Sequence, residues 1–248
     1  MWGLHGIDAG QHAMLPLQQT APDKFMQDQI NSLLTWEYPN NELTKMKGKT
    51  SVSEISENDN NQINISKKPK FLEDRIKLTR AEIGTITHLI LQKLDFRIEY
   101  DGGKLKDLID GLVKSEIISN KEAQAVDIED ILRFTESDLY HRVQKSKKIF
   151  KEQPFYINIP AEEIYECNLK ENILVQGIID LYFVDANDKI VLVDYKTDYV
   201  KDGSEQELIE KYKNQLNIYK KAIEESTETS VNETYIYSVY LHKTLQIY

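Results

Sequence analysis

Two aspartates interrupt runs of otherwise apolar residues. Asp180 lies in the run ILVQGIIDLYFV, and Asp194 lies in IVLVDYK. A buried carboxylate is costly unless it is paired with a cation or binds a metal ion. Both runs are rich in β-branched and aromatic residues, which indicates strands. The 13 residues between the aspartates suffice for two strand arms and a short turn, so an antiparallel hairpin would bring the two carboxylates together.

Lys196 adds a cation to this pair. It follows Asp194 by two residues, so both side chains project from the same face of one strand. Two carboxylates are hard oxygen ligands that suit Mg²⁺ or Mn²⁺. An ammonium group can position a water or stabilise the charge on a phosphate in its transition state. A structural salt-bridge triad at the end of a sheet is the alternative, and the D-x-K spacing alone leaves both interpretations open.

Other residues have the types and spacing to join this group. Gln215 and Tyr219 stand at i and i+4, so they share one helix face and could reach a phosphate or a base. The alternative is a buried amide and a packed tyrosine. His88 follows Gly84 by one helical turn, and the glycine permits close approach of another segment. A lone helical histidine is more often a packing or surface residue than a ligand.

The elements that position these residues follow from capping signals and periodicity. Capping boxes beginning at Thr79, Ser119 and Ser204 predict helix starts, the last helix running to about residue 225. Further helices are expected after Asp101, over 136–147, and over 24–35 with Phe25, Ile30, Leu33 and Leu34 facing inward. Strands are expected over 149–159, 173–184, 189–196 and 234–241, with a hairpin loop at 185–188. Proline in the segment Glu152-Gln153-Pro154-Phe155 implies an edge position or a bulge. The order predicts an α+β, or mixed α/β, layout with a small sheet.

Composition places limits on the function. The chain has 248 residues and a net charge of −10, which argues against loose, charge-driven binding of nucleic acid but not against carboxylates that hold metal ions. One cysteine excludes an internal disulfide and a four-cysteine zinc or iron–sulfur site, and favours the reducing cytoplasm. No apolar run approaches the ~18–20 residues that span a bilayer. The polar stretch 56–68 indicates a linker. We therefore expect an N-terminal segment, 1–70, and a folded domain, 71–248.

Five motifs in order resemble one known family. They are G-T-x-x-H (residues 84–88), E-x-P-F (152–155), V-Q-G-I-I-D (175–180), V-D-Y-K-T-D (193–198) and Q-x-x-x-Y (215–219). Together they resemble the RecB-type nuclease domain of the PD-(D/E)XK superfamily, in particular the nuclease domains of bacterial AddAB-type helicase–nucleases. The resemblance covers most of residues 71–248. It implies a restriction-endonuclease-like core, with a small mixed central sheet flanked by helices and an N-terminal helical part.

The resemblance also implies roles for individual residues. The metal ligands would be His88, Asp180, Asp194 and the main-chain carbonyl of Tyr195. Lys196 would act with the attacking water, and Glu152 would shape the site. Gln215 and Tyr219 would contact DNA or support the site.

The activity that the resemblance implies is that of a Mg²⁺- or Mn²⁺-dependent DNA exonuclease in double-strand break repair and recombination. The expected partners are DNA, with single-stranded ends preferred, a helicase motor and an AddB-like subunit. The sequence itself contains no G-x-x-x-x-G-K-[ST] P-loop. Residues 1–70 would then be partly disordered, or a remnant of an upstream helicase region. The alternatives are a catalytically silent module of the nuclease fold that docks DNA or protein, and a purely structural α+β domain.

Overall fold

The computed structural model describes residues 23–36, 47–58, 78–165, 171–200 and 204–247. The chain divides into two units, Met1–Met46 and Lys47–Tyr248. In the first unit the structure describes the helix α1 (Lys24–Leu34), which confirms the helix expected over 24–35. The expectation that its apolar stripe faces inward is wrong, because Phe25, Ile30, Leu33 and Leu34 are exposed. Within the described residues of this unit, no second helix or strand is available to bury the stripe.

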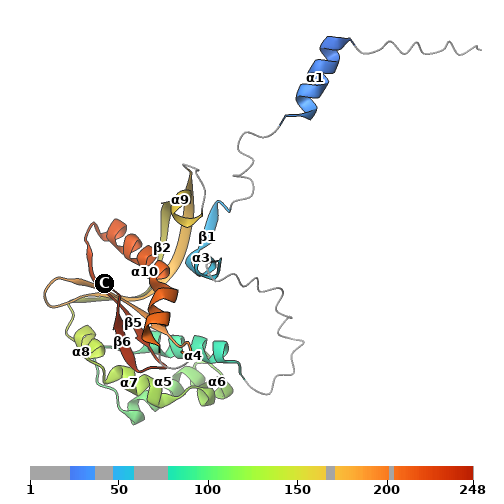
Figure 1. Ribbon diagram of the computed structural model, residues 1–248. Helices are drawn as coiled ribbons and strands as arrows, with labels where there is room; N and C mark the ends of the chain where they lie inside the picture. Colours follow the sequence, from blue (N-terminus) through green and yellow to red (C-terminus); the bar gives the residue numbers. More distant parts are fainter. Residues whose placement is uncertain (1–22, 37–46, 59–77, 166–170, 201–203, 248) are drawn as a thin grey trace, which may run out of the picture. The chain divides into compact units, whose positions relative to one another are not determined.

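The second unit is a sheet with helices on both faces (Figure 1). Its elements in chain order are β1 (Lys49–Ser51), α3 (Val52–Asn58), α4 (Arg80–Lys93), α5 (Gly102–Lys114), α6 (Asn120–Ala125), α7 (Ile128–Thr135), α8 (Asp138–Gln144), β2 (Lys148–Pro160), α9 (Ala161–Ile164), β3 (Asn172–Val184), β4 (Ile190–Lys196), α10 (Glu205–Thr227), β5 (Val231–Ser238) and β6 (Lys243–Gln246). None of the described helices is long and apolar enough to cross a membrane.

The long strand β3 organises the sheet, whose order is β1-β3-β4-β5-β6. The strand β2 pairs antiparallel with β3 along almost its whole length. The opposite edge of β3 is shared: β1 pairs parallel with residues 174–176, and β4 pairs antiparallel with residues 181–184. The strand β5 runs parallel to β4 and β6 antiparallel to β5. Residues 177–180 therefore lie where β3 passes from one neighbour to the next.

The strands present alternate residues to two helical layers. Odd-numbered positions of β3 and β4 pack into one core with the helices α4 to α8; they are Leu181, Phe183, Val191, Val193 and Tyr195. Even-numbered positions such as Asp194 and Lys196 point to the other face, where α10 lies. The helix α10 buries Leu208, Leu216 and Ile223 and also contacts α3 and β5. The alternation of side-chain direction along each strand thus decides which residues pack against which helical layer.

Most of the expected elements are present. The capping boxes at Thr79 and Ser119 are complete, and the first three predicted strands (β2, β3 and β4) and the hairpin loop lie where the sequence predicts them. Pro154 lies on the edge strand β2, as expected. The mixed α/β fold with a mixed sheet is confirmed. Of the polar stretch 56–68, α3 includes residues 56–58, and the rest lies outside the described residues.

Three local expectations need correction. The predicted helix 136–147 is the shorter α8, and a separate helix, α7, precedes it, because Ser137 caps a new helix start. The strand predicted over 234–241 is β5, which begins and ends three residues earlier, and a short strand, β6, follows it after a turn. The helix α10 begins at Glu205, but the side chain of Ser204 makes no capping hydrogen bond. Ser204 has a ψ of 100°, whereas Thr79 and Ser119 have ψ values of 160° and 161°, and the side chains of those two residues do cap their helices.

Candidate active site

The two aspartates meet at the end of the β3–β4 hairpin. The last paired residues of the two strands are Leu181 and Val193, so Asp180 and Asp194 stand opposite each other one position further on. The main-chain N–H of Tyr195 donates a hydrogen bond to Oδ2 of Asp180 at 2.9 Å. The side chain of Asp194 is only 1% exposed. The structure therefore brings the two carboxylates together, as the spacing predicts.

Lys196 lies against the same point. Its Nζ is 2.7 Å from Oδ2 of Asp194, and its side chain is 12% exposed. The ammonium also donates a hydrogen bond to Oε1 of Gln215 at 3.2 Å and lies 4.0 Å from the centroid of the Tyr212 ring. A cation held by a carboxylate, an amide and an aromatic face has little freedom to move. Lys196 is thus positioned beside the carboxylates by both β4 and α10.

The helix α10 supplies the support for this lysine. Nε2 of Gln215 donates a hydrogen bond to the hydroxyl of Tyr219 at 2.7 Å, and both residues are buried. The ring of Tyr219 in turn packs edge-on against Phe155 of β2, with centroids 5.6 Å apart. The two residues therefore lie on one helix face, and their observed contacts hold Lys196 in place. Contact of either residue with DNA stays a prediction.

His88 approaches from the other side of the sheet. Its Nδ1 lies 3.6 Å from Oδ2 of Asp180, and its ring packs edge-on against that of Tyr195. Burial lowers the pKa of His88 below its ordinary value, which favours a neutral imidazole that can donate a lone pair to a metal. The approach depends on Gly84, because a methyl group there would lie 2.5 Å from Oγ1 of Thr197. The close approach expected at Gly84 is confirmed, and the segment it meets directly follows β4.

Glu152 occupies the position opposite Asp180 on β2. The neighbouring residues pair as Lys151 with Leu181 and Gln153 with Ile179, but Glu152 itself breaks the ladder. Its φ of 49° is left-handed, which is uncommon for a residue other than glycine. Burial raises its pKa. Glu152 therefore lies on the border of the site, where its charge adds to the negative potential at Asp180.

The electrostatic balance at Asp180 is unfavourable without a further cation. Burial raises the pKa of its carboxyl well above the ordinary value, and the charge of Asp194 raises it further. The hydrogen bond from Tyr195 and the charge of Lys196 oppose this effect. Two carboxylates that repel each other in a buried place are an arrangement that a bound divalent cation would relieve.

The oxygen donors of the two aspartates fit a divalent metal ion. Oδ2 of Asp194 is buried and, apart from its ion pair with Lys196, lacks a well-aligned hydrogen-bond donor. This oxygen and the carboxylate of Asp180 are donors that suit Mg²⁺ or Mn²⁺. Within the residues that the structure describes, no three His, Cys, Asp or Glu side chains are grouped closely enough to hold a metal. The fit therefore rests on the two aspartates, and His88 and the carbonyl of Tyr195 stay predicted ligands.

Sequence reasoning missed the contribution of Tyr212 and Asp198. Tyr212 lies under the ammonium of Lys196, and its hydroxyl donates to Oδ2 of Asp198 at 2.7 Å. Lys211 Nζ contacts the other oxygen of Asp198 at 2.5 Å. The available signal was the spacing, since Tyr212 precedes Gln215 by three residues and so shares its helix face. These contacts anchor the chain just after β4 to the start of α10.

A mixed sheet with paired aspartates and a lysine at the end of a hairpin is the arrangement expected of a nuclease domain. The chain belongs to the PD-(D/E)XK nuclease superfamily, whose family model matches residues 65–245.

Individual relatives are named as a subunit of an ATP-dependent helicase/nuclease. The protein so named from Clostridium novyi (strain NT) is 36% identical over 236 residues, which is 89% of this chain and 19% of the relative. The one from Clostridium acetobutylicum is 37% identical over 237 residues, again 89% and 19%. The one from Clostridium perfringens is 38% identical over 208 residues, which is 79% and 16%. The chain thus spans about a fifth of the length of the curated relatives it matches.

Proposed function

We propose that this chain is a metal-dependent deoxyribonuclease that hydrolyses phosphodiester bonds of DNA with water as the nucleophile. One observation carries the proposal: two carboxylates that are largely buried, Asp180 and Asp194, meet beside the ammonium of Lys196. Membership of a nuclease superfamily supports this chemistry. A purely structural salt-bridge triad explains it less well, because the pKa of Asp180 is raised and the two acids repel each other.

Each side chain then has a task at the scissile phosphate. Asp180 and Asp194, with His88 and the main-chain carbonyl of Tyr195, would hold Mg²⁺ or Mn²⁺, which supplies Lewis-acid polarisation of the phosphate. Lys196 presents its ammonium to the attacking water and to the charge that develops on the phosphate oxygens. Gln215 keeps this ammonium in place through its hydrogen bond, and Tyr219 orients the amide. Glu152 shapes the border of the site without being a ligand.

The names of the relatives support a wider setting. We infer that the chain acts as the nuclease part of an AddAB-type helicase–nuclease in double-strand break repair and recombination. It would work as an exonuclease on single-stranded DNA ends that a motor supplies, together with an AddB-like subunit. The single cysteine supports a place in the reducing cytoplasm.

The test is cleavage of end-labelled single-stranded and double-stranded DNA by the purified chain in Mg²⁺, Mn²⁺ or EDTA. Cleavage should require the metal, and Asp180→Asn and Asp194→Asn should each abolish it while the fold is retained. A matched control is Asp188→Asn, because Asp188 is exposed in the turn at the opposite end of the same hairpin. Cleavage in EDTA, or full cleavage by both site variants, would overturn the proposal. Binding of DNA without cleavage by the parent chain would favour the catalytically silent module instead.

A further inference from the structure

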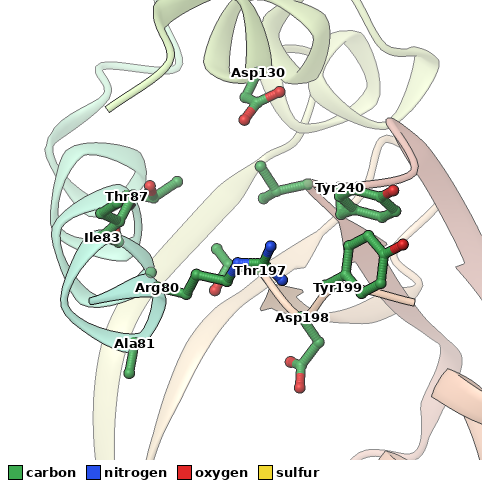
Figure 2. A pocket seen from close by; sticks show the side chains of 11 residues that line it. Arg80, Ala81, Ile83, Thr87, Asp130, Thr197, Asp198, Tyr199 and Tyr240 are labelled. Carbon is green, nitrogen blue, oxygen red and sulfur yellow. Dashed lines mark hydrogen bonds between the residues drawn. The ribbon is translucent and has the colours of Figure 1, made fainter. Parts of the chain in front are cut away.

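A pocket of about 690 Å³ opens beside the candidate active site (Figure 2). One wall is α4, from Arg80 to Thr87, and another is the segment after β4 that begins with Thr197. Thr87 directly precedes His88 in the sequence, and Thr197 directly follows Lys196. The pocket therefore borders the candidate site through the sequence neighbours of His88 and Lys196, and none of the side chains given a role above lines it.

Two tyrosines line this pocket because β4 and β5 are parallel. Lys196 and Ser238 are paired at the ends of these strands, so Tyr199 and Tyr240, which follow shortly after, leave the sheet at the same edge. Their rings lie 4.8 Å apart between centroids. They are nonetheless 55% and 45% exposed. The fold thus leaves two neighbouring tyrosine rings partly open to solvent in this pocket.

Arg80 adds a cation to the tyrosines. Its guanidinium lies 5.2 Å from the centroid of the Tyr199 ring, and Figure 2 shows it reaching from α4 toward the two rings. The carboxylates that line the pocket are engaged elsewhere. Asp130 lies 2.7 Å from Nε2 of His242, and Asp198 is held by Lys211 and Tyr212. Arg80 therefore supplies a positive charge in a pocket whose acids already have partners.

We propose that Arg80, Tyr199 and Tyr240 form a base-stacking subsite that holds an unpaired base of single-stranded DNA next to the scissile phosphate. This inference rests on the proposed nuclease function and identifies where the substrate of the nuclease is bound. Aromatic rings with a nearby arginine bind unpaired bases of any sequence, because every base has a π face. Bases within a duplex are already stacked and do not present that face. The subsite would therefore distinguish single strands from duplexes.

The charge of the whole chain supports this assignment. At a net charge of −10, general attraction to the phosphate backbone is weak. Stacking supplies affinity that does not depend on net charge.

The experiment measures binding separately from cleavage. Fluorescence anisotropy of a labelled oligothymidylate is followed with the full chain in EDTA and in Ca²⁺. Tyr199→Ala and Tyr240→Ala should each raise the Kd on the order of tenfold, the range found when a stacking aromatic is removed. Tyr240→Phe, which keeps the ring, should bind like the parent. The matched control is Tyr156→Ala, because Tyr156 is 65% exposed with Lys49 5.6 Å from its ring centroid but does not line the pocket.

A second series assigns the effect to a base. Oligonucleotides that carry one abasic residue are scanned along the strand with the parent chain and with Tyr240→Ala. At one position the abasic residue should weaken binding of the parent and leave the variant unchanged, because both changes remove the same stacking contact. Equal losses at every position would overturn the proposal. So would equal losses for duplex DNA, or tyrosine variants that keep their fold and the parental Kd.

The failure of the subsite and the failure of the nuclease function give different results. Hydrolysis of bis(p-nitrophenyl) phosphate, a phosphodiester without bases, reports on the catalytic groups of the parent chain. Hydrolysis together with tyrosine-independent binding of DNA would refute the subsite alone. Tyrosine-dependent binding without hydrolysis of DNA or of this ester would refute the nuclease and retain the subsite.

Discussion

Replacing Lys196 with methionine tests the electrostatics of the site most directly. The substitution keeps the apolar stem of the side chain and removes its charge. Asp194, which is almost fully buried, would then lose the ammonium 2.7 Å away. Breaking a buried pair typically costs ~3–5 kcal/mol, because the remaining charge is uncompensated. Lys196 retains slight exposure, so we expect about 3 kcal/mol.

This loss converts into a measurable shift of the melting temperature. For a unit of this size, 1 kcal/mol corresponds to ~2–4 °C. Lys196→Met should therefore melt about 6–12 °C below the parent in EDTA. Saturating Mn²⁺ should narrow this gap, because a cation bound only by the folded chain stabilises it and replaces the missing positive charge. Turnover should fall on the order of 10²-fold or more, as when one preorganised donor to the transition state is removed.

Lys211→Met is the matched control. Lys211 also forms an ion pair, with Asp198 at 2.5 Å, but both side chains are more open to solvent. Its removal should cost at most about 1 kcal/mol. Differential scanning fluorimetry of both variants in EDTA and in Mn²⁺ makes the comparison. The reasoning is refuted if Lys196→Met melts like the parent in EDTA, or if its melting deficit is the same with and without Mn²⁺.

Three further results are expected. Because burial lowers the pKa of His88 below 6.5, its contribution to stability is present above about pH 6.5 and is lost as the pH falls through the lowered pKa. In thermal melts over a pH series, His88→Gln should reduce this loss of stability at acid pH and raise the Mn²⁺ concentration needed for stabilisation. An unchanged pH dependence of the melting temperature and an unchanged metal requirement would contradict a ligand role. Gly84→Ala should destabilise the parent by about 1 kcal/mol through the clash with Thr197. In a Thr197→Ala background the same change should stabilise by up to about 1 kcal/mol through helix propensity, as measured by urea unfolding; the same sign in both backgrounds would disprove the clash. Hydrogen bonds from Arg142 lower the pKa of Glu233 to about 2, so its contribution is present above pH 4.5 and is lost toward pH 2. Glu233→Gln should cost about 1–2 kcal/mol at neutral pH and remove this pH dependence of the denaturation midpoint.

The centre of the site could be predicted because it is local in sequence. Asp180, Asp194 and Lys196 belong to one hairpin, and a period of two together with a short turn decides where their side chains point. The start of α4 could be predicted for a similar reason. The capping box at Thr79 involves residues only three positions apart, and its hydrogen bonds form within the segment itself.

The sequence patterns did not predict the shortest secondary-structure elements. The strands β1 and β6 have three and four residues, which are too few to show a periodic pattern. The strand β1 forms by pairing with residues 174–176, more than 120 positions away in the sequence. Pairing at such a distance depends on the rest of the fold being in place, so no local signal marks it.

The sequence by itself determined that two carboxylates and a lysine would meet on adjacent strands, with the motifs of one nuclease superfamily around them. Only the tertiary structure decided how these residues are supported and what lies next to them. His88 reaches Asp180, and Gln215 reaches Lys196, from opposite faces of the sheet. Tyr199 and Tyr240 meet because two parallel strands end together. These contacts join elements that are distant along the chain, and packing of the whole core sets their geometry, whereas periodicity and capping act only within a few residues.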